Sequence, residues 1–140
     1  MREIIFRGKR LDNGEWTEGY LYEHEPALVG IVSENDVPEP SKWFIVRTGF
    51  ADWNMPRPVE FVEVDPSTIG QYTGLKDKNG KMIFEGHILS LRTGRPHVVR
   101  FKNGAFILED SAIPISFANK FEIIGNVTDN PEILKEEAQP

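Results

Sequence analysis

The sequence contains no cysteine among its 140 residues. This absence excludes disulfide bonds, thiolate metal sites and cysteine nucleophiles, and it fits a protein of the reducing cytoplasm. Apolar runs fall well short of the roughly eighteen residues that a membrane-spanning helix needs. The first residues lead into a strand pattern where a signal peptide would have its apolar region. We therefore expect a cytoplasmic protein without a membrane segment.

Motifs for catalysis and cofactor binding are also missing. The sequence has no phosphate-binding loop and no dinucleotide-binding fingerprint, and no serine lies in a nucleophile elbow. The Asp and Glu residues include candidates for an acid–base pair, but the sequence does not separate such a pair from a solvated surface. We predict no enzymatic activity and no cofactor.

Histidine is scarce, with three residues at His24, His87 and His97. None of them has the i, i+4 spacing of zinc hydrolases. His24 stands between Glu23 and Glu25, where an exposed histidine in an acidic turn is the favoured interpretation and a metal ligand the alternative. His87 and His97 lie on neighbouring predicted strands, and a shared site between them is an alternative hypothesis. We predict no metal site.

The residues that are present predict a folded β protein. Hydrophobic residues make up 39% and aromatic residues 11% of a 16.0 kDa chain, enough for one domain with a core or for two small lobes. The net charge of −6 disfavours a dedicated nucleic-acid binder. Residues 76–102 differ from the rest, since they carry seven Lys or Arg and two acidic residues.

Three Asn-Gly dipeptides predict chain reversals, because these two residues tolerate the positive φ angles of tight hairpin turns. Asn13-Gly14 predicts a first hairpin over residues 3–22. Asn79-Gly80 is expected to form a two-residue type I′ turn. Asn103-Gly104 separates residues 98–102 from 105–109 and is the clearest hairpin of the chain. Residues 42–47 and 59–64 are further strand candidates, and residues 28–32 are another.

Aromatic residues alternate along the second arm of the first hairpin. Trp16, Tyr20 and Tyr22 share one face of the expected strand, and Thr17, Gly19 and Leu21 share the other. The favoured interpretation is that the aromatic face covers a core, since large aromatic side chains usually bury their area in this way.

The second half of the chain predicts a small barrel. Asp65 and Pro66 are expected to begin a short helical turn that joins the two parts. After a bend at Glu85-Gly86, strands over 88–92, 97–102, 105–109 and 121–128 predict an SH3-like barrel or a curled antiparallel sheet. Residues 111–120 are expected to form a loop with one helical turn, and Asn130 is expected to cap a short C-terminal helix. The predicted fold is mainly β, with α+β as the alternative, divided into 1–64, 65–128 and 129–140.

The segment from Ile69 to Leu89, here called the signature segment, resembles that of the YopX-like family of phage proteins. The likeness rests on residues 71–80, which read QYTGLKDKNG, and on Glu85-Gly86-His87-Ile88. Residues 1–9, 124–126 and 130–132 also resemble the ends of that family. His87 departs from the pattern because an Asp is usual there. The resemblance implies a phage or prophage protein and brings no established biochemical activity with it.

A basic stretch is one candidate binding site, because Lys and Arg side chains bind phosphates. Its residues are Arg92, Arg95, Arg100 and Lys102, with no acid between them. Arg100 and Lys102 are expected to share one strand face, with Val99 and Phe101 on the other. The structural alternative, which is favoured, is a solvated outer face of a small barrel.

An aromatic loop over residues 49–58 is the second candidate site, with Phe50 and Trp53 as its binding residues. The leading hypothesis is a non-enzymatic phage accessory protein that binds a protein partner, either another protein or a second copy of itself, through exposed strand edges and this loop. The alternative hypothesis is a nucleic-acid-binding module that uses the basic stretch.

Overall fold

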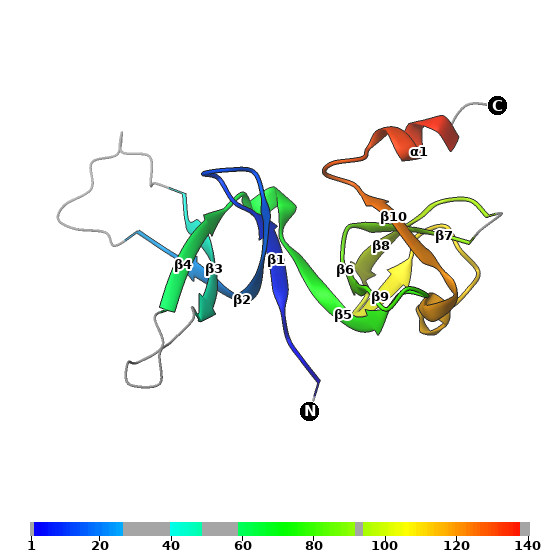
Figure 1. Cartoon of the computed structure of the whole chain (residues 1–140), viewed down its shortest axis with the longest axis horizontal. Helices are drawn as coiled ribbons and strands as arrows, with labels where there is room; N and C mark the ends of the chain where they lie inside the picture. The colour runs from blue at the N-terminus through cyan, green and yellow to red at the C-terminus, as the bar shows by residue number, and fades with distance from the viewer. Residues whose placement is uncertain (1, 27–39, 49–58, 92–93, 138–140) are drawn as a thin grey trace. The chain divides into compact units, whose positions relative to one another are not determined.

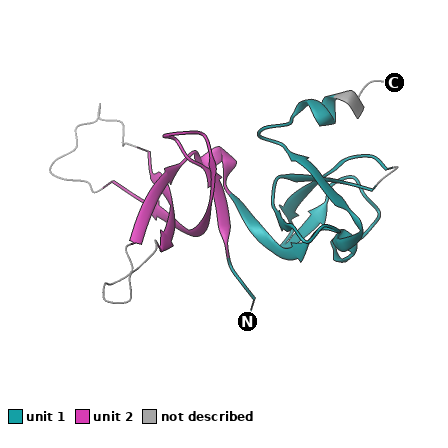
Figure 2. Cartoon of the chain, in the orientation of Figure 1, with its two compact units in different colours: residues 1–4, 70–140 teal, residues 5–69 magenta. Residues whose placement is uncertain are grey.

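The computed structural model describes residues 2–26, 40–48, 59–91 and 94–137 (Figure 1). The strand predicted over 28–32 lies outside these residues. The chain divides into two compact units, residues 5–69 and residues 1–4 together with 70–140 (Figure 2). The division predicted from the sequence had its boundary at Asp65, in the turn just before this junction. Both units consist mainly of antiparallel β-strands, as predicted. Within the described ranges, no helix has the length and hydrophobicity required to span a bilayer.

The unit of residues 5–69 is a curled sheet of four antiparallel strands in the order β1-β2-β3-β4. Its strands are β1 (Phe6–Lys9), β2 (Trp16–His24), β3 (Lys42–Thr48) and β4 (Val59–Val64). The residue after β1 pairs with the end of β4 through an Arg10–Val64 bridge, so the sheet closes on itself. The predicted first hairpin is confirmed as the β1–β2 pair.

The inner face of this sheet carries its core. Ile45 and Val64 are fully buried or nearly so, and Thr17 and Val62 lie beside them. The prediction that the aromatic residues of β2 cover the core is wrong for two of them, since Tyr20 is 68% exposed and Tyr22 is 44% exposed. The pleat turns Thr17, Gly19 and Leu21 inward, and the tyrosines therefore face outward.

A short 3-10 helix, η1 (Pro66–Thr68), ends this unit as predicted. The Asp65 carboxylate accepts the N–H of Ser67 at 3.0 Å, and Pro66 occupies a first-turn position where its missing N–H costs nothing. The Thr68 hydroxyl oxygen accepts the N–H of Lys9 at 2.8 Å. This bond fastens the turn to the end of β1.

The unit that contains residues 70–140 holds the signature segment. A hairpin of β5 (Gly70–Lys76) and β6 (Met82–Phe84) precedes a sheet in the order β10-β7-β8-β9. The sheet strands are β7 (His87–Ser90), β8 (His97–Lys102), β9 (Ala105–Leu108) and β10 (Glu122–Asn126). The core consists of Ile83, Leu89, Val99, Leu108, Ala118 and Phe121. The antiparallel arrangement is confirmed, and the SH3-like barrel stays a prediction.

Chain reversal occurs at each Asn-Gly dipeptide, but the turns differ. Asn103 and Gly104 have φ angles of 52° and 80°, as a type I′ turn requires. At the second dipeptide only Gly80 has a positive φ, so the expected type I′ turn there is wrong. The loop between Lys76 and Met82 is wider, because the N–H of Asp77 bonds to the carbonyl of Lys81 at 2.9 Å.

Two short helices complete this unit. The 3-10 helix η2 (Ile115–Lys120) lies where a single helical turn was predicted, and α1 (Glu132–Glu137) is the predicted C-terminal helix. The predicted cap of α1 is not made as expected. The Asn130 side-chain oxygen instead accepts the N–H of Asn126 at 3.2 Å, so it binds the end of β10.

Candidate functional site

The predicted basic stretch is only partly electropositive. Arg92 lies outside the described residues. Arg100 and Lys102 share one face of β8, as predicted, and both bind the carboxylate of Glu109, at 3.2 Å and 2.8 Å. The hydrogen bond from Lys102 lowers the pKa of Glu109, against a smaller effect of burial. One carboxylate therefore compensates two of the cations that the sequence offered to a phosphate.

Arg95 lines a shallow hollow beside this ion pair. The hollow has a volume of about 300 Å³ and is lined by Arg95, His97, Arg100, Glu109, Asp110 and Leu134, among others. His97 is held in it by a 3.0 Å contact between its Nδ1 and the carbonyl of Glu109. Cations and carboxylates line the hollow in similar number, so its charge selects no single class of small ligand.

An exposed ring pair lies at the end of the β8–β9 hairpin. Phe101 and Phe106 are opposite each other in the register and meet edge to face, with ring centroids 5.0 Å apart. Phe101 is 51% exposed although it continues the strand face that buries Val99. The hairpin thus extends beyond the core and presents an aromatic ring to solvent.

Asp77 is the most highly connected buried polar group of the signature segment. Its Oδ1 accepts the N–H groups of Asn79 and Lys81, each at 2.9 Å. Its Oδ2 accepts the N–H of Ile123 in β10 at 3.1 Å. Burial raises the pKa of Asp77, but the three backbone N–H groups together lower it more, and the pKa lies below its ordinary value. This carboxylate therefore has a structural role.

Acid is expected to destabilise the unit of residues 70–140 through Asp77. A carboxyl group with a lowered pKa contributes stability at pH values above its ordinary pKa of about 3.9 and loses it as the pH falls through the lowered value. Urea unfolding at pH 7 and at pH 3, followed by far-UV circular dichroism, should give a lower free energy at pH 3. In Asp77→Asn this difference should be smaller, and an equal difference would contradict the assignment.

His87 is buried and acts as a hydrogen-bond acceptor. Its Nδ1 accepts the N–H of Phe84 at 2.9 Å, and its ring meets the ring of Phe84 edge to face at 6.1 Å. Because Nδ1 accepts, the proton of the neutral ring resides on Nε2. A carboxylate oxygen at this position would supply the same kind of acceptor. The imidazole therefore fills a turn-capping role that an Asp would fill.

The histidine hypotheses for metal binding gain no support from this geometry. In the β7–β8 register His97 is opposite Leu89, so His87 and His97 are not opposite each other. His24 is exposed, with its Nδ1 3.3 Å from the hydroxyl of Tyr22. Across the described ranges, no group of three or more metal-ligating side chains comes together.

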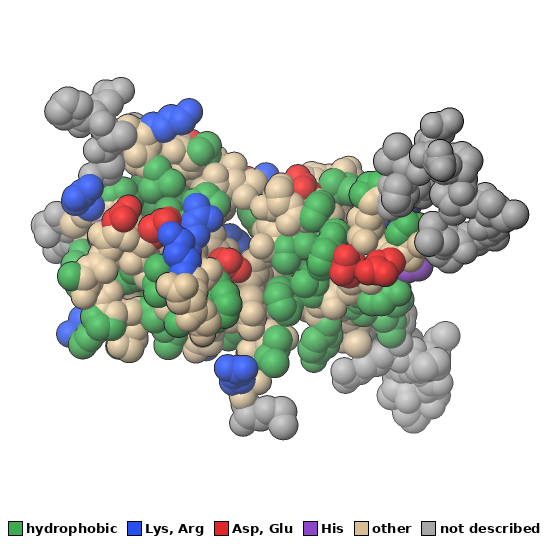
Figure 3. Space-filling view, turned by 180° about the vertical axis from the view of Figure 1, so that it is seen from behind, with side chains coloured by type: hydrophobic (Ala, Val, Ile, Leu, Met, Phe, Trp, Pro, Cys, Tyr) green, Lys and Arg blue, Asp and Glu red, His purple; other side chains and the backbone are tan. Residues whose placement is uncertain are grey.

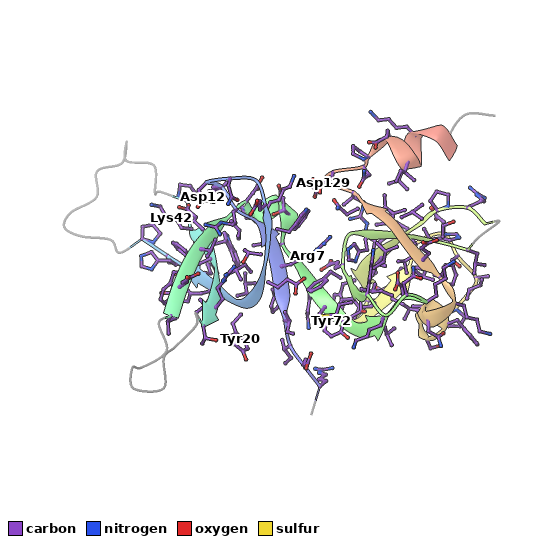
Figure 4. All side chains as sticks on the ribbon, in the orientation of Figure 1. Arg7, Asp12, Tyr20, Lys42, Tyr72 and Asp129 are labelled. Atoms are coloured by element: carbon purple, nitrogen blue, oxygen red, sulfur yellow. The ribbon has the colours of Figure 1, made fainter. Side chains whose placement is uncertain are left out.

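The outer face of β2, β3 and β4 carries a continuous group of aromatic side chains, here called the aromatic face. The rings of Tyr22, Phe44 and Phe61 contact one another, with centroids 6.1 to 6.4 Å apart. Tyr20, labelled in Figure 4, extends this face, and Phe61 is 59% exposed. Hydrophobic side chains are visible at the surface of this unit in Figure 3. Exposed apolar groups of this kind mark interaction sites on soluble proteins.

Sequence reasoning placed the protein-binding residues elsewhere. Phe50 and Trp53, the predicted residues, lie outside the described residues. Phe44 and Phe61 were missed because each was read only as part of a strand. The available signal was alternation, since Phe44 precedes the buried Ile45 and Phe61 precedes the buried Val62.

Two units of antiparallel β-strands, one carrying an exposed aromatic face and the other a carboxylate-centred loop, define a small β protein in whose described residues no metal-binding cluster comes together. A family model described as YopX protein matches residues 6–135. The chain belongs to the YopX family, as the resemblance of the signature segment indicated.

The fold is also found in a solved structure, the crystal structure of protein EF1440 from Enterococcus faecalis. The two chains are 22% identical, and the alignment covers 96% of this chain and 99% of that one, with a TM-score of 0.55. At this identity the likeness concerns the fold alone. A search of curated proteins gave no match.

Proposed function

We propose that this chain is a phage-type accessory protein without enzymatic activity that binds a protein partner through the aromatic face. The observation that supports the proposal is a group of contacting rings on one strand face, in which Tyr22 and Phe61 are exposed and Phe44 is half-buried between them. A cytoplasmic location, in the host cell if the gene is a phage gene, fits the absence of cysteine.

Protein binding explains why such rings remain outside. Aromatic residues are enriched at protein–protein interfaces, and tyrosine is among the residues that contribute most binding energy there. Keeping these rings in water forgoes roughly 1.5–3 kcal/mol for each large apolar side chain that burial would supply. A partner, either another protein or a second copy, recovers that free energy when it covers the face.

The test compares the wild-type chain with Phe61→Ser and Tyr22→Ser. We expect the wild-type chain to retain a partner in affinity capture from infected host extract, or to self-associate in light scattering, and both variants to lose that association. Phe117→Ser is the matched control, because Phe117 is an exposed aromatic residue of the other unit. A strictly monomeric wild-type chain that captures nothing contradicts the proposal, as does capture that is unaffected by Phe61→Ser.

Nucleic-acid binding by the β8–β9 hairpin is the second candidate. The exposed ring of Phe101, between Arg100 and Lys102 in the sequence, supports it, because bases stack on such rings beside cationic side chains. The ion pairs to Glu109 weaken it. An electrophoretic shift of single-stranded DNA, measured at two salt concentrations, tests this second function. Absence of binding at low salt would exclude nucleic-acid binding.

A further inference from the structure

We infer that the partner of the aromatic face is a segment of a different protein that is both basic and apolar, in which Lys or Arg side chains stack on the exposed rings. This inference rests on the proposed protein-binding function and names the chemistry of its partner. Three features of the unit of residues 5–69 support it: its net charge, the engagement of its own cations, and the arrangement of its rings.

The acidic charge of the chain resides in the unit that carries the aromatic face. Residues 5–69 contain twelve Asp or Glu and six Lys or Arg, which gives a net charge of −6. The other unit contains ten of each and is neutral. A basic partner is therefore attracted to this unit and not to the other, and complementary charge of this kind determines partner choice more than raw affinity.

Most cations of this unit are already engaged within it. Arg10 pairs with Asp12 at 2.7 Å, and Arg47 pairs with Glu60 at 3.3 Å. Several glutamates, in contrast, form no ion pair within the described part of the chain. They are Glu18 and Glu63 on the same strand face as the rings, and Glu23 and Glu25 at the end of β2. These carboxylates are available to cations of a partner, and Lys42 is the exposed cation nearest to them in the register.

The unit contains its own example of the proposed contact. Two cations of β1 lie beside the ring of Trp16, the first residue of β2. The guanidinium of Arg7 lies 4.1 Å from the centroid of that ring, and the Nζ of Lys9 lies 5.8 Å from it. Such cation–π contacts contribute about 0.5–1 kcal/mol when exposed and more when water is excluded. The rings of Tyr22, Phe44 and Phe61 offer further faces on β2, β3 and β4, where the described residues place no cation within ring contact.

A second copy of this chain fits the face less well. Two units of −6 charge repel when their acidic faces meet, and like charges across an interface oppose association. A nucleic-acid backbone meets the same repulsion. A basic and apolar protein segment instead covers the rings and compensates the glutamates.

The experiment uses the full chain and three synthetic peptides. The first is a peptide of lysine and leucine, the second replaces every lysine with glutamate, and the third replaces every leucine with serine. Binding is measured by fluorescence anisotropy. We expect the lysine–leucine peptide to bind, and the other two to bind at least about tenfold more weakly, since both charge and apolar contact contribute. Raising the salt from about 0.01 M to about 0.15 M should weaken binding, because the screening length falls from about 30 Å to about 8 Å.

Variants locate the binding. Phe61→Ser should weaken binding of the lysine–leucine peptide about tenfold. The double variant Glu18→Gln with Glu63→Gln should bind the lysine–leucine peptide with an affinity that depends less on salt concentration. A matched double variant with the same change of net charge, Glu3→Gln with Glu132→Gln in the other unit, should leave this salt dependence unchanged. Circular dichroism of each variant establishes that the fold is retained.

Each contrary outcome has a distinct meaning. If the glutamate–leucine peptide binds equally well, or if the chain forms a dimer that Phe61→Ser dissociates, the inference of a basic partner is overturned while protein binding by the face stands. If the lysine–leucine peptide binds with the same affinity to Phe61→Ser, or does not bind at low salt, the inference is overturned. If in addition no partner depends on Phe61, the proposed function falls with it.

Discussion

Replacing Asp77 with asparagine is expected to lower the free energy of unfolding of the unit of residues 70–140 by about 2–4 kcal/mol. The carboxylate accepts three backbone N–H groups. An amide side chain has one acceptor oxygen, so in either orientation its NH₂ group faces an N–H that it cannot bind. A buried donor left without a partner costs about 1–3 kcal/mol, and the loss of the charge weakens the remaining bonds.

The measurement needs a probe that reports on this unit. All three tryptophans, Trp16, Trp43 and Trp53, belong to residues 5–69, so their fluorescence follows the other unit. Urea unfolding by far-UV circular dichroism should be combined with amide hydrogen exchange at Ile123, which should accelerate in Asp77→Asn. The matched control is Asp110→Asn, an exposed position with a φ of 59° that asparagine tolerates. A change below about 0.5 kcal/mol for Asp77→Asn, the range of ordinary surface substitutions, would refute the role assigned to this carboxylate.

Gly19→Ala is expected to destabilise the unit of residues 5–69 by about 3 kcal/mol, at the upper end of the usual cost of overpacking. A Cβ at this position would lie 2.4 Å from the carbonyl oxygen of Val46 and 3.0 Å from the Cγ2 of Ile45. The nearer atom belongs to the backbone of β3, which is paired with β2, so the strand pair must separate to relieve the overlap. Because the rings of the aromatic face reside on these strands, binding of a partner should weaken as well.

Tryptophan fluorescence during urea unfolding measures this effect, since the tryptophans report on this unit. Gly14→Ala is the control, because Gly14 has a φ of 72° and no atom within 4 Å of its Cβ position. It separates left-handed backbone strain, which costs about 1 kcal/mol or somewhat more, from steric overlap. Equal destabilisation by the two substitutions would show that close approach of the strands at Gly19 is not the cause.

The strand pattern could be predicted from the sequence where local chemistry decides it. Asp65 and Pro66 encode η1 through side-chain and ring geometry that involves few other residues. Asn103 and Gly104 encode their turn in the same local way. At Asn79 the local preference of Asn-Gly for a type I′ turn is overridden. The Asp77 carboxylate instead organises a wider loop through its bonds to Asn79, Lys81 and the distant Ile123. The sequence of the loop itself contains no pattern that predicts a hydrogen bond to Ile123, because Ile123 lies far along the chain.

The aromatic face could not be predicted for a related reason. Alternation in β2 separates Tyr20 and Tyr22 from Thr17 and Leu21, but it does not state which set faces the core. The tyrosines have the larger apolar area, and area alone favours burying them. The register with β3 reverses that choice, since Leu21 is opposite the buried Ile45 and β3 approaches Gly19 too closely for a Cβ.

The basic stretch shows the same limit for charge. Residues 92–102 contain no acid, and a local count therefore predicts a cationic surface. Pairing of β8 with β9 brings Glu109 beside Arg100 and Lys102. Glu109 follows the hairpin turn in the sequence, so its compensation of the two cations can be recognised only once the strand register is known.

The bond between Asp77 and Ile123 joins positions 46 residues apart. During synthesis, the signature segment leaves the ribosome well before the strand that completes the hydrogen bonding of Asp77. A peptide that ended before β10 would keep the whole signature segment and still hold a carboxylate short of one donor. The local sequence pattern of the segment is thus complete before its structure is, because the hydrogen bonds of Asp77 extend to the last strand.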